Sequence, residues 1–321
     1  MSSSQYLFQP NLSKWSDWEA ISTNSGVFSS LIQEILYREK LFLYKEEKVE
    51  NLPKGTNAVF RVSDIVVKIY PPDEITSGFS ISDFNSEIFG MKFSEKCSVT
   101  AAKLITSGTI EDKYIFHYLI IGYVNGRNLA DYLSTLAPKE QYKTGKKLRA
   151  ITNKLNIRTK KFNEIDIFND KNRNFRWEGY SDAFKNGRLL HIKTSDSYKR
   201  TDEFVFTHAD LWRNNILVEN KTNEIVLIDF ADSILAPKFY EKINIISDFV
   251  KFRHFLRGYL EEDKEKNNGK ILAEEILDGI LIHDFGAEIV GILFGKSCVG
   301  GLTVEKLREL IEGLVLDIWK D

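Results

Sequence analysis

The sequence predicts a two-lobed α+β fold, with a small, mostly antiparallel sheet in the N-terminal lobe and a larger, mainly helical C-terminal lobe. The chain has 321 residues, of which 43% are hydrophobic, and that is enough for two packed cores. Short β-branched runs are frequent up to about residue 122, whereas apolar residues recur at helical spacing from Ile243 onward. We therefore expect an N-lobe at residues 1–120, a hinge at 121–126 and a C-lobe at 127–321.

The composition argues against several classes of protein. The net charge is −2 and the pI is near 6.3, so neither a nucleic-acid footprint nor a basic membrane patch is expected. Cys97 and Cys298 are too few for a disulfide framework or a zinc site, and they fit a reducing cytoplasm. The start of the chain lacks the features of a signal peptide, and no apolar run is long enough to span a membrane. We expect a cytoplasmic protein that binds neither nucleic acid nor membrane, of open oligomeric state.

The N-terminal lobe begins with a predicted helix and continues with strands. Apolar residues fall at helical spacing over residues 27–36, and strand-like runs follow at 41–44, 58–62 and 65–70. Between the first two runs, the turn Pro-Lys-Gly-Thr-Asn contains Gly55 and Thr56, and its backbone N–H groups can bind a phosphate. An ordinary turn has the same pattern, so both interpretations stay open.

A lysine and a glutamate in this lobe form a predicted ion pair. In the last of these strands, alternation places Lys68 on the same face as Val66 and Tyr70. In the helix predicted at 80–96, Glu87 lies within the apolar stripe. A carboxylate on a buried stripe needs a cation, because an unpaired buried charge is costly. Lys68 is the nearest candidate in sequence, and a strand lysine paired with a helix glutamate is typical of folds that bind nucleotide phosphates.

The end of the N-terminal lobe has the pattern of a hinge. Strand-like runs at 101–106 and 114–118 lead into the apolar run 119–122, and a glycine-containing turn then precedes a predicted helix at 129–133. Backbone groups around Ile121 and Tyr123 can contact an adenine edge. An ordinary strand-to-helix turn is equally compatible with this pattern.

The stretch 204–232 carries the most informative pattern of the chain. Residues 138–199 before it are charged and irregular, and we predict a helix and then a variable insertion with no assigned chemistry. Within the stretch, the apolar runs 216–218 and 225–228 are joined by the polar turn Asn-Lys-Thr-Asn. This arrangement predicts an antiparallel hairpin.

Four polar residues around this hairpin predict phosphoryl transfer. The hairpin brings a loop with Asp210 and Asn215 near the strand end that carries Asp229. Phosphoryl transfer needs a positioned hydroxyl and neutralised phosphate charge. Asp210 can accept the proton of the hydroxyl, while Asn215 and Asp229 offer the oxygen ligands that Mg²⁺ prefers. His208 is predicted to support the loop structurally rather than to act as a base.

The segments His-Ala-Asp-Leu-Trp-Arg-Asn-Asn at 208–215 and Ile-Asp-Phe-Ala-Asp at 228–232 resemble the aminoglycoside phosphotransferase and choline kinase superfamily of small-molecule kinases. The first segment looks closest to hygromycin phosphotransferases, and its Asp-Leu-Trp is also similar to fructosamine kinases. The resemblance runs from about Pro53 to Val250. It implies a protein-kinase-like fold that uses ATP or GTP with Mg²⁺.

Two positions depart from the pattern of this superfamily. Glu241 follows Tyr240 at the place where most members carry an aspartate that braces the catalytic loop, and hygromycin-type enzymes show glutamate there too. The predicted helix 146–155 lacks the histidine that these enzymes often carry near its end, and it has Thr152 and Asn153 instead.

Two rival interpretations fit less well. A regulated protein kinase carries arginine where this chain has Ala209, and the segment between Asp229 and Glu241 is too short for a long activation loop. A pseudokinase-like nucleotide-binding scaffold has no need for metal ligands, yet Asn215 and Asp229 are both present.

The C-terminal part supplies candidates for the acceptor side. Helices are predicted at 271–282, 283–294 and 303–319, the last with Thr303 as N-cap. Acids on these and the preceding helix can attract a cationic sugar, although each is more often a solvated helix residue. The acids in question are Asp248, Asp284 and Glu288.

The sequence thus predicts a kinase that transfers the γ-phosphate of ATP or GTP to a hydroxyl of a small acceptor. An aminoglycoside-like antibiotic is the first acceptor class, which would make this an antibiotic-resistance enzyme; a sugar, fructosamine or amino alcohol is the alternative. The acceptor-binding residues are left open. The expected roles are catalysis for Asp210, nucleotide binding for Lys68, Glu87, Gly55, Thr56, Ile121 and Tyr123, metal binding for Asn215 and Asp229, and loop support for His208.

Overall fold

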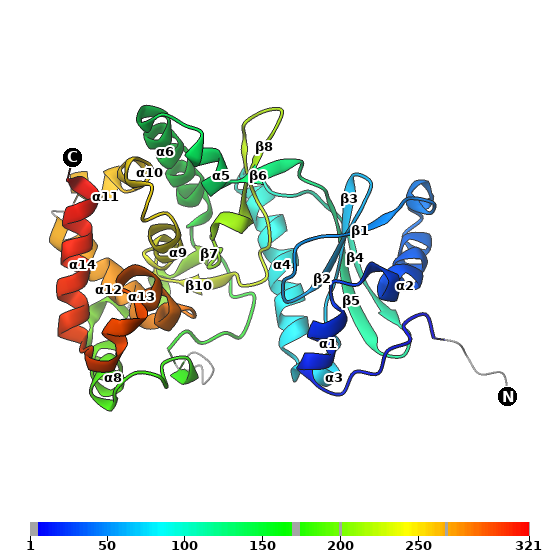
Figure 1. Cartoon of the computed structure of the whole chain (residues 1–321), viewed down its shortest axis with the longest axis horizontal. Coiled ribbons are helices and arrows are strands. Elements are labelled where there is room, and N and C mark those ends of the chain that lie inside the picture. Colours follow the sequence, from blue (N-terminus) through cyan, green and yellow to red (C-terminus); the bar gives the residue numbers. More distant parts are fainter. Residues whose placement is uncertain (1–5, 169–173, 199–200, 267–268, 321) are drawn as a thin grey trace. The chain divides into compact units, whose positions relative to one another are not determined.

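The computed structural model describes residues 6–168, 174–198, 201–266 and 269–320. The chain divides into two compact units (Figure 1). The N-terminal unit comprises Met1–Glu95 and Thr100–Asn125, and the C-terminal unit comprises Lys96–Val99 and Gly126–Asp321.

The N-terminal unit is built on a five-stranded sheet in the order β1-β2-β3-β5-β4, with every neighbouring pair antiparallel (Figure 1). The strands predicted at 58–62 and 65–70 are both present. The bounds are β1 (Val49–Asn51), β2 (Ala58–Val62), β3 (Ile65–Ile69), β4 (Leu104–Glu111) and β5 (Ile115–Gly122).

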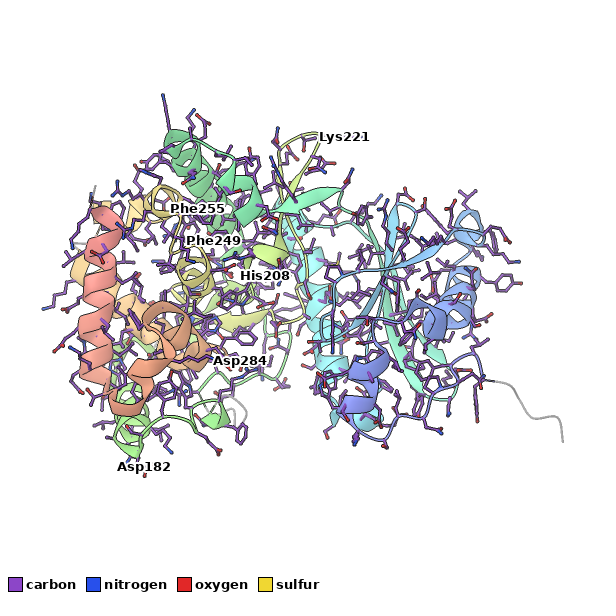
Figure 2. The ribbon with its side chains drawn as sticks, viewed as in Figure 1. Asp182, His208, Lys221, Phe249, Phe255 and Asp284 are labelled. Carbon is purple, nitrogen blue, oxygen red and sulfur yellow. The ribbon has the colours of Figure 1, made fainter. Side chains whose placement is uncertain are left out.

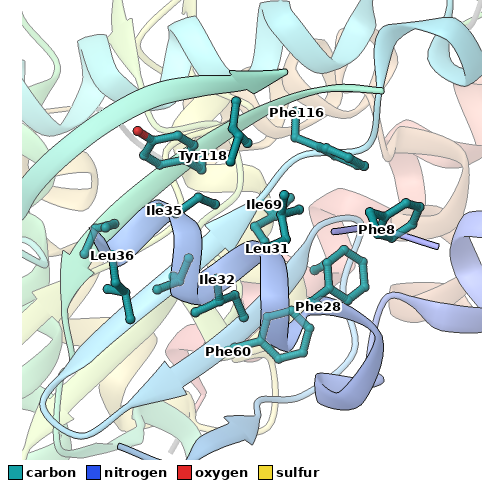
Figure 3. Packing of buried hydrophobic residues seen from close by; sticks show 14 of the residues in the cluster. Phe8, Phe28, Leu31, Ile32, Ile35, Leu36, Phe60, Ile69, Phe116 and Tyr118 are labelled. Carbon is teal, nitrogen blue, oxygen red and sulfur yellow. The ribbon is translucent and has the colours of Figure 1, made fainter. Parts of the chain in front are cut away.

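Different helices cover the two faces of this sheet. One face packs on α2 (Ser25–Arg38), which buries an apolar stripe against β3 residues such as Ile69 (Figure 3). On the other face, Phe84 of α4 (Phe79–Lys96) packs with Tyr70 and Leu119. Successive residues of β3 therefore point to opposite helices, as the alternation predicts. Short helices α1 (Trp15–Ile21) and α3 (Asp73–Thr76) complete the unit.

Two predictions for this unit are wrong. Residues 41–44 are not a strand: they contain the 3-10 turn η1 (Phe42–Tyr44). Its residue Leu43 is 91% exposed, so this apolar run does not pack as a strand does, and the chain has already turned at Lys40, whose φ is 60°. The run at 101–106 only overlaps the true strand β4, because β4 is an edge strand that tolerates the polar residues beyond it.

The C-terminal unit contains a two-stranded sheet, β10-β7, and a three-stranded sheet, β6-β8-β9. The predicted hairpin is confirmed, since β8 and β9 are antiparallel with Ile216 opposite Leu227. Figure 2 labels Lys221 in the hairpin turn, where Asn223 has a φ of 55° that asparagine tolerates better than most residues. The bounds are β6 (Gly126–Asn128), β7 (Val205–Thr207), β8 (Ile216–Glu219), β9 (Ile225–Leu227) and β10 (Ile234–Ala236).

Helices form most of this unit, and two of them cross at glycines. A Cβ at Gly145 of α6 would lie 2.0 Å from the carbonyl oxygen of Phe255, and a Cβ at Gly258 of α10 would lie 2.0 Å from that of Tyr142. Only glycine permits this approach. The helices are α5 (Leu129–Ser134), α6 (Pro138–Leu155), α8 (Asp182–Thr194), α9 (Tyr240–Asp248), α10 (Arg253–Tyr259), α11 (Glu261–Lys266), α12 (Gly269–Ile282), α13 (Gly286–Phe294) and α14 (Val304–Trp319).

Some of the helix predictions for this unit need correction, and others are confirmed. The apolar residues that recur at helical spacing from Ile243 onward lie on several helices, because α9 ends at Asp248. The predicted insertion contains the helix α8. Thr303 caps α14 as predicted, since its Oγ1 accepts the Lys306 N–H at 3.1 Å.

Parts of the predicted insertion, residues 169–173 and 199–200, and the side chain of Cys298 lie outside the described part of the chain. Among the helices that the structure describes, none is long and apolar enough to cross a membrane.

Candidate active site

The loop after β7 places His208 against the end of β9. The His208 side chain is fully buried, and its Nε2–H donates to the carbonyl oxygen of Ile228 at 3.0 Å. Its ring also packs on Phe230, with centroids 4.5 Å apart. His208 therefore connects the loop that carries Asp210 to the segment that carries Asp229.

The next residue, Ala209, has a left-handed backbone. Its φ is 65°, a conformation that costs a non-glycine residue about 1–2 kcal/mol. Both of its peptide groups are held by side chains of α9: its N–H donates to Glu241 Oε1 at 3.2 Å, and its carbonyl oxygen accepts from Asn244 Nδ2 at 3.2 Å. These bonds stabilise the turn that presents Asp210.

Glu241 makes the brace that the resemblance implies. Its Oε2 accepts the N–H of His208 at 2.7 Å and the Nδ2 of Asn156 at 3.1 Å. Asn156 caps the C-terminus of α6 and also donates to Phe206 O at 3.1 Å. Burial raises the pKa of Glu241 to about 7, while the donors from His208, Asn156 and Ala209 act to lower it.

Asp210 is fixed by its neighbours in the loop. Asn215 Nδ2 donates to Asp210 Oδ2 at 2.7 Å and to the Asp210 carbonyl oxygen at 2.9 Å. The Trp212 side chain lies close enough to the Asp210 carboxylate to act on its pKa, which it lowers. Because the amide nitrogen of Asn215 donates to Asp210, the amide oxygen of Asn215 is the atom that can bind another ligand.

Carboxylates gather around Asp210. Burial, followed by the charges of Asp232 and Asp229, raises the pKa of Asp210 to about 9, against the opposing effect of the Asn215 and Trp212 side chains. Asp229 lies two residues beyond β9 with a φ of 63°, a left-handed conformation that aspartate adopts more readily than most residues. Like charges at close range need a cation to ionise together.

The donor set suits a divalent cation that keeps other ligands. Asp210, Asn215 and Asp229 offer oxygens, which Mg²⁺ prefers, and the crowding of carboxylates is relieved by positive charge. Among the residues that the structure describes, no group of three His, Cys, Asp or Glu residues could hold a metal ion alone. A Mg²⁺ ion here would therefore share its coordination with phosphates and water, as this ion usually does.

In the N-terminal unit, the predicted contact between Lys68 and Glu87 is confirmed. Lys68 Nζ lies 2.6 Å from Glu87 Oε2, and both side chains are buried, at 5% and 1% exposed. The hydroxyl of Tyr70 donates to the same oxygen. The Glu87 carboxylate thus has a cation and a hydroxyl as partners, which is how a protein stabilises a buried charge.

The weaker nucleotide-binding candidates also lie in the N-terminal unit. A Cβ at Gly55 would meet no atom within 4 Å, so close packing does not require a glycine there, and the Thr56 carbonyl oxygen accepts from Trp18 Nε1 at 2.9 Å. Ile121 is paired within β5, between Val66 and Leu104. The Tyr123 N–H already donates to Asp64 O at 2.9 Å, so a base would have to use other backbone groups of this stretch.

The comparison with protein families decides the identity. A family model described as "Phosphotransferase enzyme family" matches residues 48–269, more than half of the chain. The chain belongs to this phosphotransferase family. It is therefore an enzyme, a small-molecule kinase that transfers a phosphoryl group to a hydroxyl, and the resemblance seen in the catalytic segments is confirmed. A comparison with curated proteins gives no match.

Solved structures share the fold of this phosphotransferase. An amicoumacin kinase in complex with AMP-PNP and Ca²⁺ matches with a TM-score of 0.56 and 14% identity, over 89% of this chain and 95% of that one. The GDP complex of aminoglycoside 2'-phosphotransferase-IIIa matches at 0.54 and 16%, over 89% and 99%. A microcompartment-associated aminopropanol kinase matches at 0.50 and 15%, over 88% and 95%. These likenesses confirm the predicted protein-kinase-like α+β fold.

The acids that the sequence nominates for the acceptor side of this phosphotransferase are all bound to arginines. Asp248 accepts three donors of Arg213, including Nη2 at 2.6 Å and the backbone N–H at 2.6 Å. Arg176 Nη2 lies 3.2 Å from Asp284 Oδ2, and Arg176 Nη1 lies 3.1 Å from Glu288 Oε1. Each of these acids therefore has an arginine partner, and Glu288 is also 48% exposed to solvent.

Four residues of the site went unassigned in the sequence. Tyr70 was placed on the face of Lys68 without a role, and Asp232 stood in the second family segment. Trp212 also stood in a family segment, but nothing in its spacing indicated that its side chain acts on the pKa of Asp210. Asn156 could have been found one residue beyond the predicted helix 146–155, where a helix-capping residue is common.

Proposed function

We propose that this phosphotransferase carries out Mg²⁺-dependent transfer of the γ-phosphoryl group of ATP or GTP to a hydroxyl of a small acceptor, with Asp210 as the base. The observation that carries the proposal is the arrangement around Asp210: Asn215 fixes its carboxylate at 2.7 Å while Asp229 and Asp232 crowd it electrostatically. A structural aspartate would gain nothing from such crowding, which raises the free energy of its ionised form.

Asp210 can accept a proton only when it is ionised. Because the pKa of Asp210 is raised, its carboxyl group keeps its proton more readily than an ordinary aspartate does when no cation is bound. Mg²⁺, when bound, supplies positive charge to the phosphates and favours the ionised carboxylates. Asn215 then keeps the Asp210 carboxylate in one orientation, so that a hydroxyl placed against it is both positioned and deprotonated as transfer proceeds.

We assign the metal to the amide oxygen of Asn215 and the carboxylate of Asp229. Lys68 is proposed to bind the nucleotide phosphates, with Glu87 holding its ammonium group at 2.6 Å. We also propose that the backbone of the loop at Gly55 and Thr56 contacts the phosphates. The backbone of Ile121 and Tyr123 is proposed to contact the base. His208 is proposed to support the loop.

The acceptor class is the open part of the proposal. An aminoglycoside-like antibiotic is the class that the sequence motif favours, and a protein whose structure matches is named an aminoglycoside phosphotransferase. A sugar, fructosamine or amino alcohol is the second class, and the arginine partners of the nominated acids favour it.

The proposal is tested by nucleoside diphosphate release in a coupled assay with a panel of aminoglycosides, sugars and amino alcohols. The wild type should release diphosphate with at least one acceptor, and Asp210→Asn should reduce the rate by roughly two to four orders of magnitude, as a lost general base does. Nucleotide affinity, measured by calorimetry, should stay nearly unchanged.

The matched control is Asp182→Asn, which removes an equal charge from an exposed position in α8 (Figure 2). It should keep the wild-type rate. Near-native transfer in Asp210→Asn would take the base role away from Asp210, and no acceptor-dependent release from the wild type would count against the proposed acceptors.

A further inference from the structure

The first turn of α9 directs two charged side chains to different neighbours. Glu241 contacts the catalytic loop, where its Oε2 accepts the His208 N–H at 2.7 Å and its Oε1 accepts the Ala209 N–H at 3.2 Å. Lys242, the next residue, lies about 100° further around the helix and reaches α11 and α12. Glu241 is 1% exposed and Lys242 is 3% exposed, so both charged groups are buried.

Lys242 is held by carboxylates from two other helices. Its Nζ lies 2.6 Å from Asp263 Oδ1 of α11 and 2.6 Å from Glu275 Oε2 of α12. The same oxygen of Asp263 accepts from Arg149 Nη2 of α6 at 3.0 Å. We name Lys242, Asp263, Glu275 and Arg149 the α9 anchor.

The α9 anchor is linked to the catalytic loop a second time, through α6. The helix that supplies Arg149 is capped by Asn156, whose Nδ2 donates to Glu241 Oε2 at 3.1 Å. The two helices α6 and α9 are therefore joined at two places, by Asn156 with Glu241 and by Asp263 with Lys242. A rotation or a slide of α9 would disturb both places together, because Glu241 and Lys242 are consecutive residues of one helix.

Stability alone does not account for a lysine at this position. A buried ammonium group loses its hydration, and the attraction of its partners often only offsets that cost, so an apolar side chain of similar size stabilises a fold about as well. An ion network differs from apolar contact in direction. Lys242 Nζ has to stay within hydrogen-bonding distance of two carboxylates on different helices, whereas the hydrophobic effect is non-directional. The α9 anchor therefore fixes where α9 lies.

The position of α9 matters because its side chains hold a strained residue of the catalytic loop. Ala209 has a φ of 65°, and α9 binds both of its peptide groups, the N–H through Glu241 and the carbonyl oxygen through Asn244. Asp210 is the next residue, so a shift of α9 changes the direction of the Asp210 carboxylate. A misplacement of about 1 Å can reduce an enzymatic rate by roughly 100-fold.

We propose that Lys242 is a positioning residue for phosphoryl transfer, which acts on Asp210 through the position of α9. The α9 anchor holds this helix where Glu241 and Asn244 stabilise the loop. This inference rests on the proposed function, because it takes Asp210 as the base.

Hydrogen exchange of the His208 and Ala209 amides, measured by NMR without nucleotide, tests the proposal. Lys242→Met removes the ammonium group and keeps a long side chain, while Asp263 retains its second cation. Both amides should exchange on the order of tenfold faster than in the wild type, because the bonds that protect them open more often. Amides of α14 should respond less, which separates a local effect on the loop from a lower stability of the whole unit.

Two neighbouring glutamates of α12 give a milder variant and its matched control. Glu275→Gln removes a carboxylate from Lys242, whereas Glu274→Gln removes one from Arg308 of α14. Glu275 is 30% exposed and Glu274 is 39% exposed, so both substitutions should leave the urea midpoint nearly unchanged. Glu275→Gln should accelerate exchange of the two loop amides by roughly threefold. Glu274→Gln should leave their exchange at the wild-type rate.

Turnover tests the link to catalysis. Lys242→Met should reduce diphosphate release at saturating nucleotide on the order of tenfold, and nucleotide affinity should stay within about twofold of the wild type. Adding Lys242→Met to Glu241→Gln should reduce turnover little further, because the contact through which Lys242 acts is already broken. A purely structural role would instead lower stability and leave turnover of the folded enzyme at the wild-type value.

Three results would overturn the proposal: unchanged exchange of both amides in Lys242→Met, equal effects of Glu274→Gln and Glu275→Gln, or faster exchange with wild-type turnover. The exchange measurement does not depend on an acceptor. If the loop amides respond while no acceptor supports diphosphate release by the wild type, the proposed function fails and the positioning of the loop by Lys242 stands. If transfer occurs and the amides do not respond, the role of Lys242 fails alone.

Discussion

Two groups of charged residues in this protein are arranged in opposite ways. In the N-terminal unit, the Glu87 carboxylate is paired with Lys68 at 2.6 Å and also accepts from Tyr70. In the C-terminal unit, Asp210 lies among carboxylates that raise its pKa. The first group is a buried pair of opposite charges, whereas in the second group charges of the same sign act on Asp210.

The difference shows what each group requires from outside the chain. A buried ion pair loses stability when either partner is removed, because the remaining charge stays in an apolar environment. A cluster of like charges gains stability when one charge is removed. The fold therefore stabilises the Lys68–Glu87 pair by itself, while Asp229 and Asp232 raise the free energy of the ionised form of Asp210, a cost often found at functional sites.

The largest expected effect of any substitution is at Asp229. Asp229→Ala should reduce Mg²⁺-dependent turnover by roughly three or more orders of magnitude, because a metal ligand is worth several kcal/mol in the transition state. Since residue 229 has a φ of 63°, alanine adds backbone strain of about 1–2 kcal/mol. Asp229→Asn avoids that strain and should lose comparable activity with cooperative unfolding.

Diphosphate release measured against Mg²⁺ concentration checks this prediction, with Asp182→Ala as the surface control. Near-native turnover in both Asp229 variants would show that the metal is bound elsewhere.

The next largest effect on turnover is expected at the Lys68–Glu87 ion pair. Lys68→Ala should reduce turnover by roughly two orders of magnitude, because it removes a cation assigned to the phosphates. Glu87→Ala should reduce it less, since Lys68 remains and loses only its orientation. Steady-state kinetics of the two variants tests the order, and a larger loss for Glu87→Ala would reverse the assignment.

A smaller effect is expected at the loop brace. Glu241→Gln replaces one of two acceptor oxygens with a donor that faces the N–H groups of His208 and Ala209. The free energy of unfolding should fall by about 1–3 kcal/mol, and turnover should fall by roughly 10- to 100-fold as the loop shifts. Glu241→Asp keeps both oxygens and should retain more of each. Unfolding and kinetics that match the wild type in Glu241→Gln would remove the brace from the account.

Much of the fold could be predicted because it follows from local patterns. Alternation along β3 and the residue after it places Lys68 and Tyr70 on one face, and the turn Asn-Lys-Thr-Asn specifies the hairpin. The Lys68–Glu87 pair was predictable because the cost of an unpaired buried charge leaves few alternatives. The run at 41–44 failed for the opposite reason, since short apolar runs carry no information about which neighbours will cover them.

The remainder of the site depends on contacts that local patterns do not report. Arg176 and Asp284 are 108 residues apart, and Asn156 and Glu241 are 85 apart. Their side chains meet only because helices from distant parts of the chain pack together. The sequence offered Asp284 and Glu288 as candidates for the acceptor side but could not show that an arginine binds both of them.

The sign of a charge-removal effect on stability follows from the pKa of each group. In the folded protein the pKa of Asp210 is raised, so the folded state holds the proton more tightly than the unfolded state does. This stabilisation is complete below the ordinary pKa of about 4 and is lost as the pH rises toward the folded value. Without metal, the wild type should therefore lose stability over this range, and Asp210→Asn should lose less. Burial raises the pKa of Glu241 in the same direction, and both proteins share that contribution.

The most direct measurement compares urea unfolding of Glu87→Gln and Asp210→Asn with the wild type, without metal and at about pH 8, where the proton on Asp210 is partly lost. Glu87→Gln should lower the free energy of unfolding by about 3–5 kcal/mol, because it breaks a buried pair. Asp210→Asn should leave it unchanged or raise it, because it relieves the repulsion among Asp210, Asp229 and Asp232. If both variants lose stability to the same extent, the carboxylates around Asp210 are already compensated within the fold, and the account of a loop built to receive a cation is wrong.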